Sequence, residues 1–197
     1  MVQVSRWDRL KDPLGVLQGV ADHVADGFGA HLVLAGPAAD SVHDDPEEEQ
    51  VLRQAQQAWS SLPSSKRVGC IWPCLPMDDL EENRAIVNAL QRRADVVGQK
   101  SLAEGFGLTV TEAMWKARPI VVSQVGGIQD QIIHGHSGLL VADPTDLRSF
   151  AGAIETLLAA RDRALQMGAE AHRRVCDHYL APRRLTHELD LIEQVAG

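Results

Sequence analysis

Two acidic residues stand eight positions apart in one glycine-containing stretch, Glu104-Gly-Phe-Gly-Leu-Thr-Val-Thr-Glu112. Gly105 and Gly107 permit positive φ and let a ligand come close to the backbone. Thr109 is expected to begin a helix, and the free amides and positive dipole of a helix start attract anions. The stretch therefore predicts a phosphate-binding site with two carboxylates beside it.

The two acids differ in what else they could do. Glu112 is the fourth residue of Thr109-Val-Thr-Glu112, so it either closes a capping box on the Thr109 amide, the more common case, or accepts two hydrogen bonds from a ribose diol. Glu104 lies between small residues beyond an expected strand and has no capping role. Its carboxylate is well placed to accept hydrogen bonds from sugar hydroxyl groups.

Two cationic residues, Arg6 and Lys11, follow the first expected strand and precede a helix that Pro13 starts. A guanidinium group offers a planar fork that matches phosphate, and an ammonium group offers a mobile point charge. The alternatives are a solvated charged loop or an ion pair between Arg6 and Asp8.

A third loop contains the glycine pair Gly126-Gly127, again after an expected strand. Paired glycines expose backbone amides that can contact a sugar or a phosphate. A simple tight turn is equally consistent with the pair.

Short apolar runs alternate with amphipathic stretches through most of the chain. The expected strands are Val2–Ser5, His31–Ala35, Val68–Trp72, Asp95–Gln99, Ile120–Ser123 and Gly138–Val141, and the expected helices are Pro13–Val24, Glu47–Trp59, Leu80–Arg93 and Thr109–Lys116. This alternation predicts an α/β domain over residues 1–145, a Rossmann-like, doubly wound parallel sheet with helices on both faces. Such sheets bind ligands at the carboxyl ends of their strands, where all three loops fall.

The pattern changes after residue 145, where no further strand is expected. Three successive helices are expected instead: Asp146–Ala160, Arg163–His178 and Arg184–Val195. Asp146 supplies an N-cap for the first. The last carries Leu185, Leu189 and Ile192 at helical spacing, a stripe that packs either on the core or on another domain. We expect residues 146–197 to pack on the preceding domain.

The composition of the 197-residue chain excludes several kinds of partner. A formal net charge of -8 and 4% aromatic residues argue against nucleic acid. No apolar run has the length of a membrane span or a signal peptide, and the three cysteines form no framework, so a cytoplasmic location is expected. Neither the cysteines nor the acidic run from His43 to Glu49 has metal-ligand spacing, so no metal site is expected.

The stretch from Glu104 to Glu112 resembles the signature of the retaining family-four glycosyltransferases of the GT-B fold. Arg6 and Lys11 fall where that family carries its basic pair, and Gly126-Gly127 falls where it carries a later glycine loop. Val-Ser-Arg-Trp-Asp, Gln-Lys-Ser and Thr-Glu-Ala-Met-Trp-Lys-Ala-Arg-Pro are similar to the trehalose synthase (trehalose glycosyltransferring) branch. That branch has Lys100-Ser101 where most of the family has Pro-Ser.

The resemblance implies that the chain is the C-terminal, donor-binding half of an enzyme that joins a nucleotide-diphosphate glucose to glucose, giving trehalose with retention. Related trehalose phosphorylases, which use phosphate as the acceptor of glucose, and other sugar transferases share much of the signature. A stand-alone nucleotide-binding module without catalysis is an alternative of a different class.

The resemblance also implies residue roles. Arg6 and Lys11 would bind the donor diphosphate and stabilise the charge of the leaving group, and Glu104 would bind the glucose hydroxyl groups. Glu112 would bind the ribose, and Lys100 would lie near the same phosphates. The other implied donor-binding residues are Gly105, Phe106, Gly107, Leu108, Thr109, Gly126 and Gly127. Neither a cofactor nor a metal is implied, because the cationic side chains would take over the role of a metal.

A GT-B enzyme also needs a second Rossmann-like domain, N-terminal in sequence, to hold the acceptor. That domain is missing from these 197 residues. The chain alone is therefore expected to bind a nucleoside diphosphate or its glucose conjugate, with the nucleobase near Cys70–Leu75, and to transfer glucose slowly or not at all.

Overall fold

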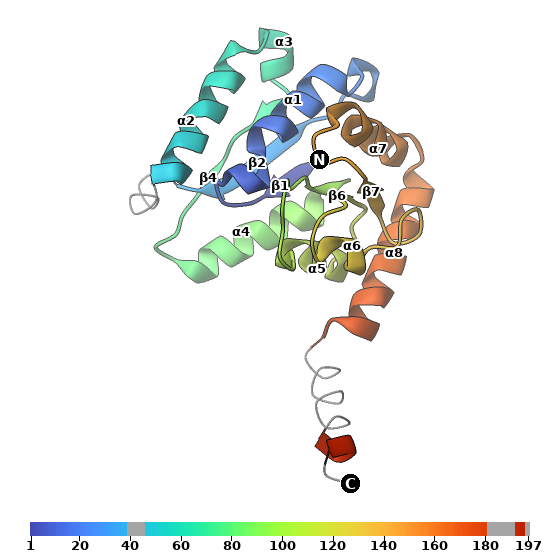
Figure 1. Cartoon of the computed structure of the whole chain (residues 1–197). Helices are drawn as coiled ribbons and strands as arrows, with labels where there is room; N and C mark the ends of the chain where they lie inside the picture. Colours follow the sequence, from blue (N-terminus) through green and yellow to red (C-terminus); the bar gives the residue numbers. More distant parts are fainter. Residues whose placement is uncertain (39–45, 181–191, 196–197) are drawn as a thin grey trace.

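A computed structural model describes residues 1–38, 46–180 and 192–195 of the chain (Figure 1). In that described part, no helix is both long and apolar enough to cross a membrane.

Seven parallel strands of the described chain form one sheet. They are β1 (Val2–Val4), β2 (Leu32–Pro37), β3 (Cys70–Ile71), β4 (Cys74–Leu75), β5 (Val97–Gln99), β6 (Ile120–Ser123) and β7 (Leu139–Val141). Their order is β3-β2-β1-β5-β6-β7, and β4 also pairs with β2. From β1 the chain adds β2 and then β3 on one side. It then crosses to the other side of β1, where it adds β5, β6 and β7 in order. The boundary between β1 and β5 is therefore the switch point at which doubly wound sheets bind ligands.

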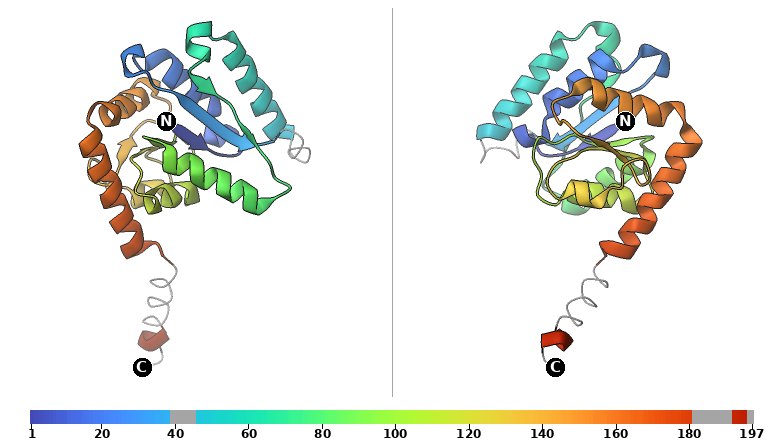
Figure 2. Two further views of the ribbon diagram at one scale, coloured as in Figure 1. Left: turned by 180° about the vertical axis from the view of Figure 1, so that it is seen from behind. Right: turned by 45° about the vertical axis from the view of Figure 1, so that its right-hand side comes forward.

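Helices cover both faces of this sheet, as predicted. They are α1 (Pro13–His23), α2 (Pro46–Ser61), α3 (Ser64–Arg67), α4 (Leu80–Arg93), α5 (Leu108–Trp115), α6 (Ile128–Gln131), α7 (Leu147–Ala159) and α8 (Arg161–His178), with short 3₁₀ helices η1 (Arg9–Lys11) and η2 (Asp26–Phe28). Figures 1 and 2 show α1 and α7 on one side of the sheet and α4 and α5 on the other. The predicted Rossmann-like α/β fold is thus confirmed.

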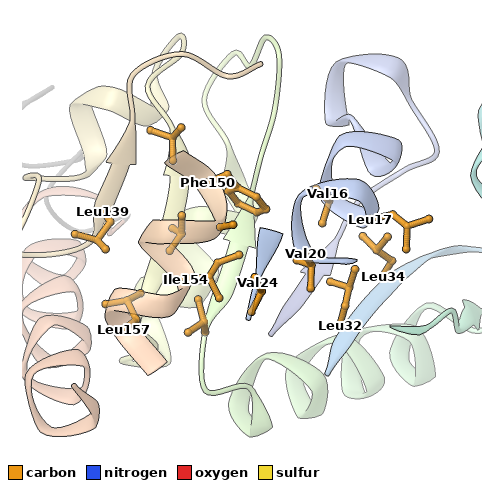
Figure 3. Packing of buried hydrophobic residues seen from close by; sticks show 14 of the residues in the cluster. Val16, Leu17, Val20, Val24, Leu32, Leu34, Leu139, Phe150, Ile154 and Leu157 are labelled. Atoms are coloured by element: carbon orange, nitrogen blue, oxygen red, sulfur yellow. The ribbon is translucent and has the colours of Figure 1, made fainter. Parts of the chain in front are cut away.

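The core lies in two layers, one on each face. Figure 3 shows the first, where Phe150 and Ile154 of α7 face Val16 and Val20 of α1 above the strands. The second joins α5, α6 and α8 to the opposite face, and its members include Val110, Met114, Ile128, Ala171 and Val175. Burying one such side chain stabilises the fold by roughly 1.5–3 kcal/mol. The helices after residue 145 are part of both layers.

Some element boundaries differ from the predicted ones. Val68 does not begin a strand; it caps α3 and is 78% exposed. The predicted strand ends early, and a second short strand, β4, resumes after Pro73, which has no amide hydrogen for a ladder bond. Of the predicted helix Arg184–Val195, residues 184–191, including Leu185 and Leu189, lie outside the described residues; residues 192–195 are helical.

Candidate functional site

A cleft of about 370 Å³ opens at the switch point between β1 and β5. It collects residues from the two loops that leave the carboxyl ends of these neighbouring strands. Its walls include seven of the twelve predicted site residues: Arg6, Lys11, Glu104, Phe106, Gly107, Leu108 and Thr109. The two sequence motifs therefore meet in space, although about ninety residues separate them.

The first loop is held by Trp7, which the sequence did not single out. Its buried ring stacks on Trp72, with 5.0 Å between centroids, and its indole Nε1 donates to the carbonyl of Pro37. Beside it, the Arg6 side chain is 64% exposed and pairs with Glu48 at 3.2 Å and with Asp8 at 3.4 Å. The Arg6–Asp8 pair suggested by the sequence is therefore present. Ion pairs made by a largely exposed side chain are weak, so the Arg6 guanidinium group stays accessible to an anion.

Lys11 and Glu104 form an ion pair across the cleft, with side chains that are 19% and 12% exposed. The other oxygen of Glu104 accepts a hydrogen bond from the Gly105 amide at 3.2 Å. In this structure, the predicted phosphate-binding cation and the predicted sugar-binding acid thus neutralise each other.

The start of α5 points backbone donors at the cleft. Gly107 is the N-cap, in a left-handed conformation with φ of 79°, and provides no side-chain cap. Among the described residues, the backbone amides of Leu108 and Thr109 donate to no protein acceptor. Since the N-terminus of a helix carries partial positive charge, these free amides could donate hydrogen bonds to an anion. The Thr109 hydroxyl instead donates to Gln99 at 2.8 Å.

This geometry excludes the capping-box alternative for Glu112. The helix begins one residue earlier than predicted, and its N-cap is Gly107 rather than Thr109. Glu112 is exposed and does not line the cleft. Burial lowers the pKa of Lys116, one turn further along, and the charge of Glu112 opposes this shift. The carboxylate of Glu112 is therefore exposed on α5, outside the cleft wall, and its charge acts on Lys116.

Lys100 lies below the cleft rather than on its wall. Its side chain is 0% exposed, and its ammonium group pairs with Asp12. The resemblance implies that Lys100 lies near the donor phosphates; in the structure Lys100 is buried beneath the residues that line the cleft and does not itself line it.

The glycine pair in the third loop, Gly126-Gly127, contacts the backbone of the loop that carries Glu104 and Gly105. Gly126 has φ of 49°, and the Gly127 amide donates to the carbonyl of Gly105 at 2.7 Å. A Cβ atom on Gly126 would lie 1.7 Å from the carbonyl oxygen of Glu104. The pair forms a tight turn that touches the Glu104–Gly105 backbone and does not line the cleft.

Several polar residues that shape the site were missed by the sequence analysis. Gln99 lines the cleft and bonds to both Ser101 and Thr109. Gln3 and Asp12 connect the two loops from below. Only Asp12 had a local signal, because an Asp before Pro13 is a typical N-cap. Within the described chain no group of three or more potential metal ligands occurs, and residues 43–45 of the acidic run lie outside it.

Comparison with known proteins agrees with the family resemblance seen in the sequence. The model of the glycosyl transferases group 1 family matches residues 80–174. A trehalose synthase of Rubrobacter xylanophilus is 40% identical over 200 residues, which cover 100% of this chain and 44% of that protein. The trehalose synthase of Pyrococcus horikoshii is 33% identical over 207 residues, with the same two coverages. The chain belongs to the group 1 glycosyl transferases.

A solved structure shows the same fold. HepE of Anabaena in complex with UDP-glucose superposes with a TM-score of 0.75 at 20% identity, over 99% of this chain and 48% of that one. The glycosyltransferase chain described here therefore has the fold of a GT-B C-terminal domain. It spans less than half the length of these relatives.

Proposed function

We propose that this chain is the donor-binding half of a retaining glucosyltransferase that forms trehalose from a nucleotide-diphosphate glucose and glucose. The observation that carries the proposal is the cleft, in which Arg6, Lys11 and Glu104 meet the free amides at the start of α5. The alignment of the whole chain with trehalose synthases supports the choice of product.

The diphosphate of the donor would lie between the first loop and the start of α5. Arg6 would bind it through its planar fork, and Lys11 would add a point charge. The amides of Leu108 and Thr109, with the flanking backbone of Gly105 to Gly107, would complete the anion site. No metal is proposed, because the cationic side chains and the amides would stabilise the charge that develops on the leaving group.

The two carboxylates would bind the rest of the donor. Glu104 would accept hydrogen bonds from glucose hydroxyl groups, and Glu112 would accept them from the ribose diol. In the transfer step, the bond between glucose C1 and the diphosphate oxygen breaks, and the electron pair leaves with the diphosphate. The acceptor hydroxyl oxygen forms the new bond to C1 on the same face, and its proton passes to the diphosphate.

Titration calorimetry tests donor binding directly. UDP, ADP, GDP and their glucose conjugates would be titrated into the chain, and we expect at least one pair to bind below millimolar concentration. If none binds, the site assignment fails.

The Glu112→Ala variant tests the ribose contact with a built-in control. Losing a hydrogen bond to a charged group costs about 1.5–3 kcal/mol, so nucleotide affinity should fall at least about tenfold. The 2′-deoxy form of the same nucleotide should lose less affinity, because it lacks one of the two hydroxyl groups. Thermal stability should stay unchanged, since Glu112 caps nothing in the structure. Equal losses for both nucleotides would show that Glu112 does not contact the ribose.

A further inference from the structure

A fully buried lysine lies beneath the cleft, at the point where β5 ends. The Lys100 side chain is 0% exposed, and its ammonium group pairs with Asp12. A buried ammonium group is costly unless it is paired. Lys100 therefore needs its acidic partner, Asp12, to be held in place, although Asp12 stands 88 positions earlier in the chain.

Asp12 is built into the fold to serve as that partner. One carboxylate oxygen caps α1 by accepting from the Gly15 amide at 3.0 Å, and the other faces Lys100. Its backbone is left-handed, with φ of 45°, a conformation that few residues other than glycine adopt. A Cβ atom on Gly15 would lie 2.1 Å from the Asp12 carboxylate and 2.7 Å from the Lys100 ammonium group. Glycine at position 15 thus leaves the space that the pair occupies.

Two further bonds tie the same loops together. The Gln3 side chain accepts from the Lys100 amide at 2.9 Å and donates to the carbonyl of Lys11 at 2.9 Å. The Leu102 amide donates to the carbonyl of Leu10 at 2.7 Å. The segment that ends in Lys11 and Asp12 is therefore fixed to the segment from Lys100 to Leu102 by these hydrogen bonds.

We propose that Lys100 is a positioning residue, which acts through its buried pair with Asp12 to hold Lys11 in place for the donor diphosphate. This rests on the proposed donor-binding function. Lys100 does not touch the donor; it holds the Asp12 carboxylate, and with it the backbone of the neighbouring residue Lys11. The left-handed turn at Asp12 then sets the direction in which the Lys11 side chain leaves the loop.

The Asp12→Asn variant separates positioning from direct contact. Asn caps helices as well as Asp and tolerates the left-handed conformation, so the fold should persist. If Lys100 acts through Asp12, affinity for the tightest-binding of UDP, ADP and GDP should fall about tenfold. If Lys100 instead binds phosphate directly, freeing it from Asp12 should leave that affinity unchanged or raise it, and the proposal would be overturned.

A double-mutant cycle gives the second measurement. Lys100→Met should weaken nucleotide binding in the natural chain and have little further effect in the Asp12→Asn background, because both changes remove the same pair. Equal effects of Lys100→Met in the two backgrounds would contradict the proposal.

Hydrogen–deuterium exchange without nucleotide gives a readout that does not depend on the proposed function. In both variants, amides of residues 8–12 and of Leu102 should exchange at least about tenfold faster, while those of α7 should not change. Unchanged exchange in the loop would refute the positioning role. If the loop loosens as expected but the natural chain binds no nucleotide, only the proposed donor site fails.

A pair of helical glycines supplies a matched control that keeps every charge. Gly15→Ala would force the Asp12–Lys100 pair apart, whereas Gly152→Ala in α7 meets no atom within 4 Å. Both changes favour a helix equally. We expect Gly15→Ala alone to weaken nucleotide binding and to loosen residues 8–12. Identical behaviour of the two variants would count against a packed ion pair at this position.

Discussion

The pair between Lys11 and Glu104 connects the two halves of the proposed donor site through a single contact. A diphosphate that enters the cleft would carry more negative charge than Glu104 and would compete with it for the Lys11 ammonium group. Once released, the Glu104 carboxylate would be free to accept hydrogen bonds from a sugar. Under the proposed function, binding of the diphosphate would therefore prepare Glu104 for the glucose.

Glu104→Gln should separate the two effects. With the competing charge removed, affinity for the nucleoside diphosphate should rise by about threefold, the size typical of a partly exposed ion pair. The additional affinity that the glucose conjugate gains over the diphosphate alone should fall, since an amide accepts weaker hydrogen bonds than a carboxylate. Calorimetry with each nucleotide and its glucose conjugate measures both. A fall in affinity for the diphosphate itself would mean that Lys11 does not exchange partners.

Gly126 offers a test of how the second loop is supported. Gly126→Ala would place a Cβ atom 1.7 Å from the carbonyl oxygen of Glu104, so the loop would have to move and nucleotide affinity should fall at least tenfold. Gly135→Ala is the matched control, because Gly135 also has a positive φ but meets nothing within 4 Å. Gly135→Ala should lose about 1 kcal/mol of stability from backbone strain alone, and Gly126→Ala should lose more because of the overlap. Equal nucleotide affinity in the two would show that the contact with Glu104 is unimportant.

At the scale of elements, α8 is connected to the loop that carries Phe106. Arg174 of α8 donates to the carbonyls of Gln131 and Asp130 at 2.7 Å each, and buried Gln131 donates to the carbonyl of Phe106. The Phe106 ring also lies edge-on to Tyr179, with 5.9 Å between centroids. The end of α8 is thus joined to the wall of the cleft through α6.

Arg174→Ala should therefore loosen the cleft from a distance. We expect faster hydrogen exchange at residues 105–108 and a loss of nucleotide affinity of about threefold to tenfold, because two hydrogen bonds that hold α6 are removed. Arg173→Ala is the control, because Arg173 stands next to Arg174, is exposed and, among the described residues, pairs only with Glu170. Identical exchange at residues 105–108 in the two variants would disprove the coupling.

The sequence predicted the parts of the site that depend on local chemistry. Alternating strands and helices placed the Arg6–Lys11 loop and the Glu104–Thr109 loop at one edge of a parallel sheet, and the structure brings them into one cleft. Contacts between distant residues were not predictable. Lys100 is buried because Asp12 faces it, and no local pattern connects those positions. The capping box failed because the Thr109 hydroxyl binds Gln99, which leaves Gly107 as the cap.

At the scale of the whole molecule, part of the cleft wall is both apolar and exposed. Phe106 and Leu108 form this apolar rim, with 46% and 68% of their surface exposed. These apolar side chains border the proposed diphosphate site, where water would compete with every polar contact. A second domain that covered this rim would exclude water and strengthen the electrostatic interactions inside the cleft.

A fusion with the part of a relative that lies outside the alignment tests the reaction itself. The chain aligns with 44% of the Rubrobacter xylanophilus trehalose synthase, so the rest of that protein can be joined to this chain in the order that the alignment gives. We expect the chain alone to bind the donor without measurable transfer, and the fusion to make trehalose from the glucose conjugate and glucose. Lys11→Ala in the fusion should lower kcat by about 10²–10³, as expected when a group that stabilises developing charge is lost. A folded fusion that needs no nucleotide and instead transfers glucose from trehalose to inorganic phosphate, releasing the other glucose, would identify a phosphorylase. One that makes trehalose equally fast with Lys11→Ala would remove Lys11 from the reaction and leave the leaving-group charge to Arg6 and the amides of α5.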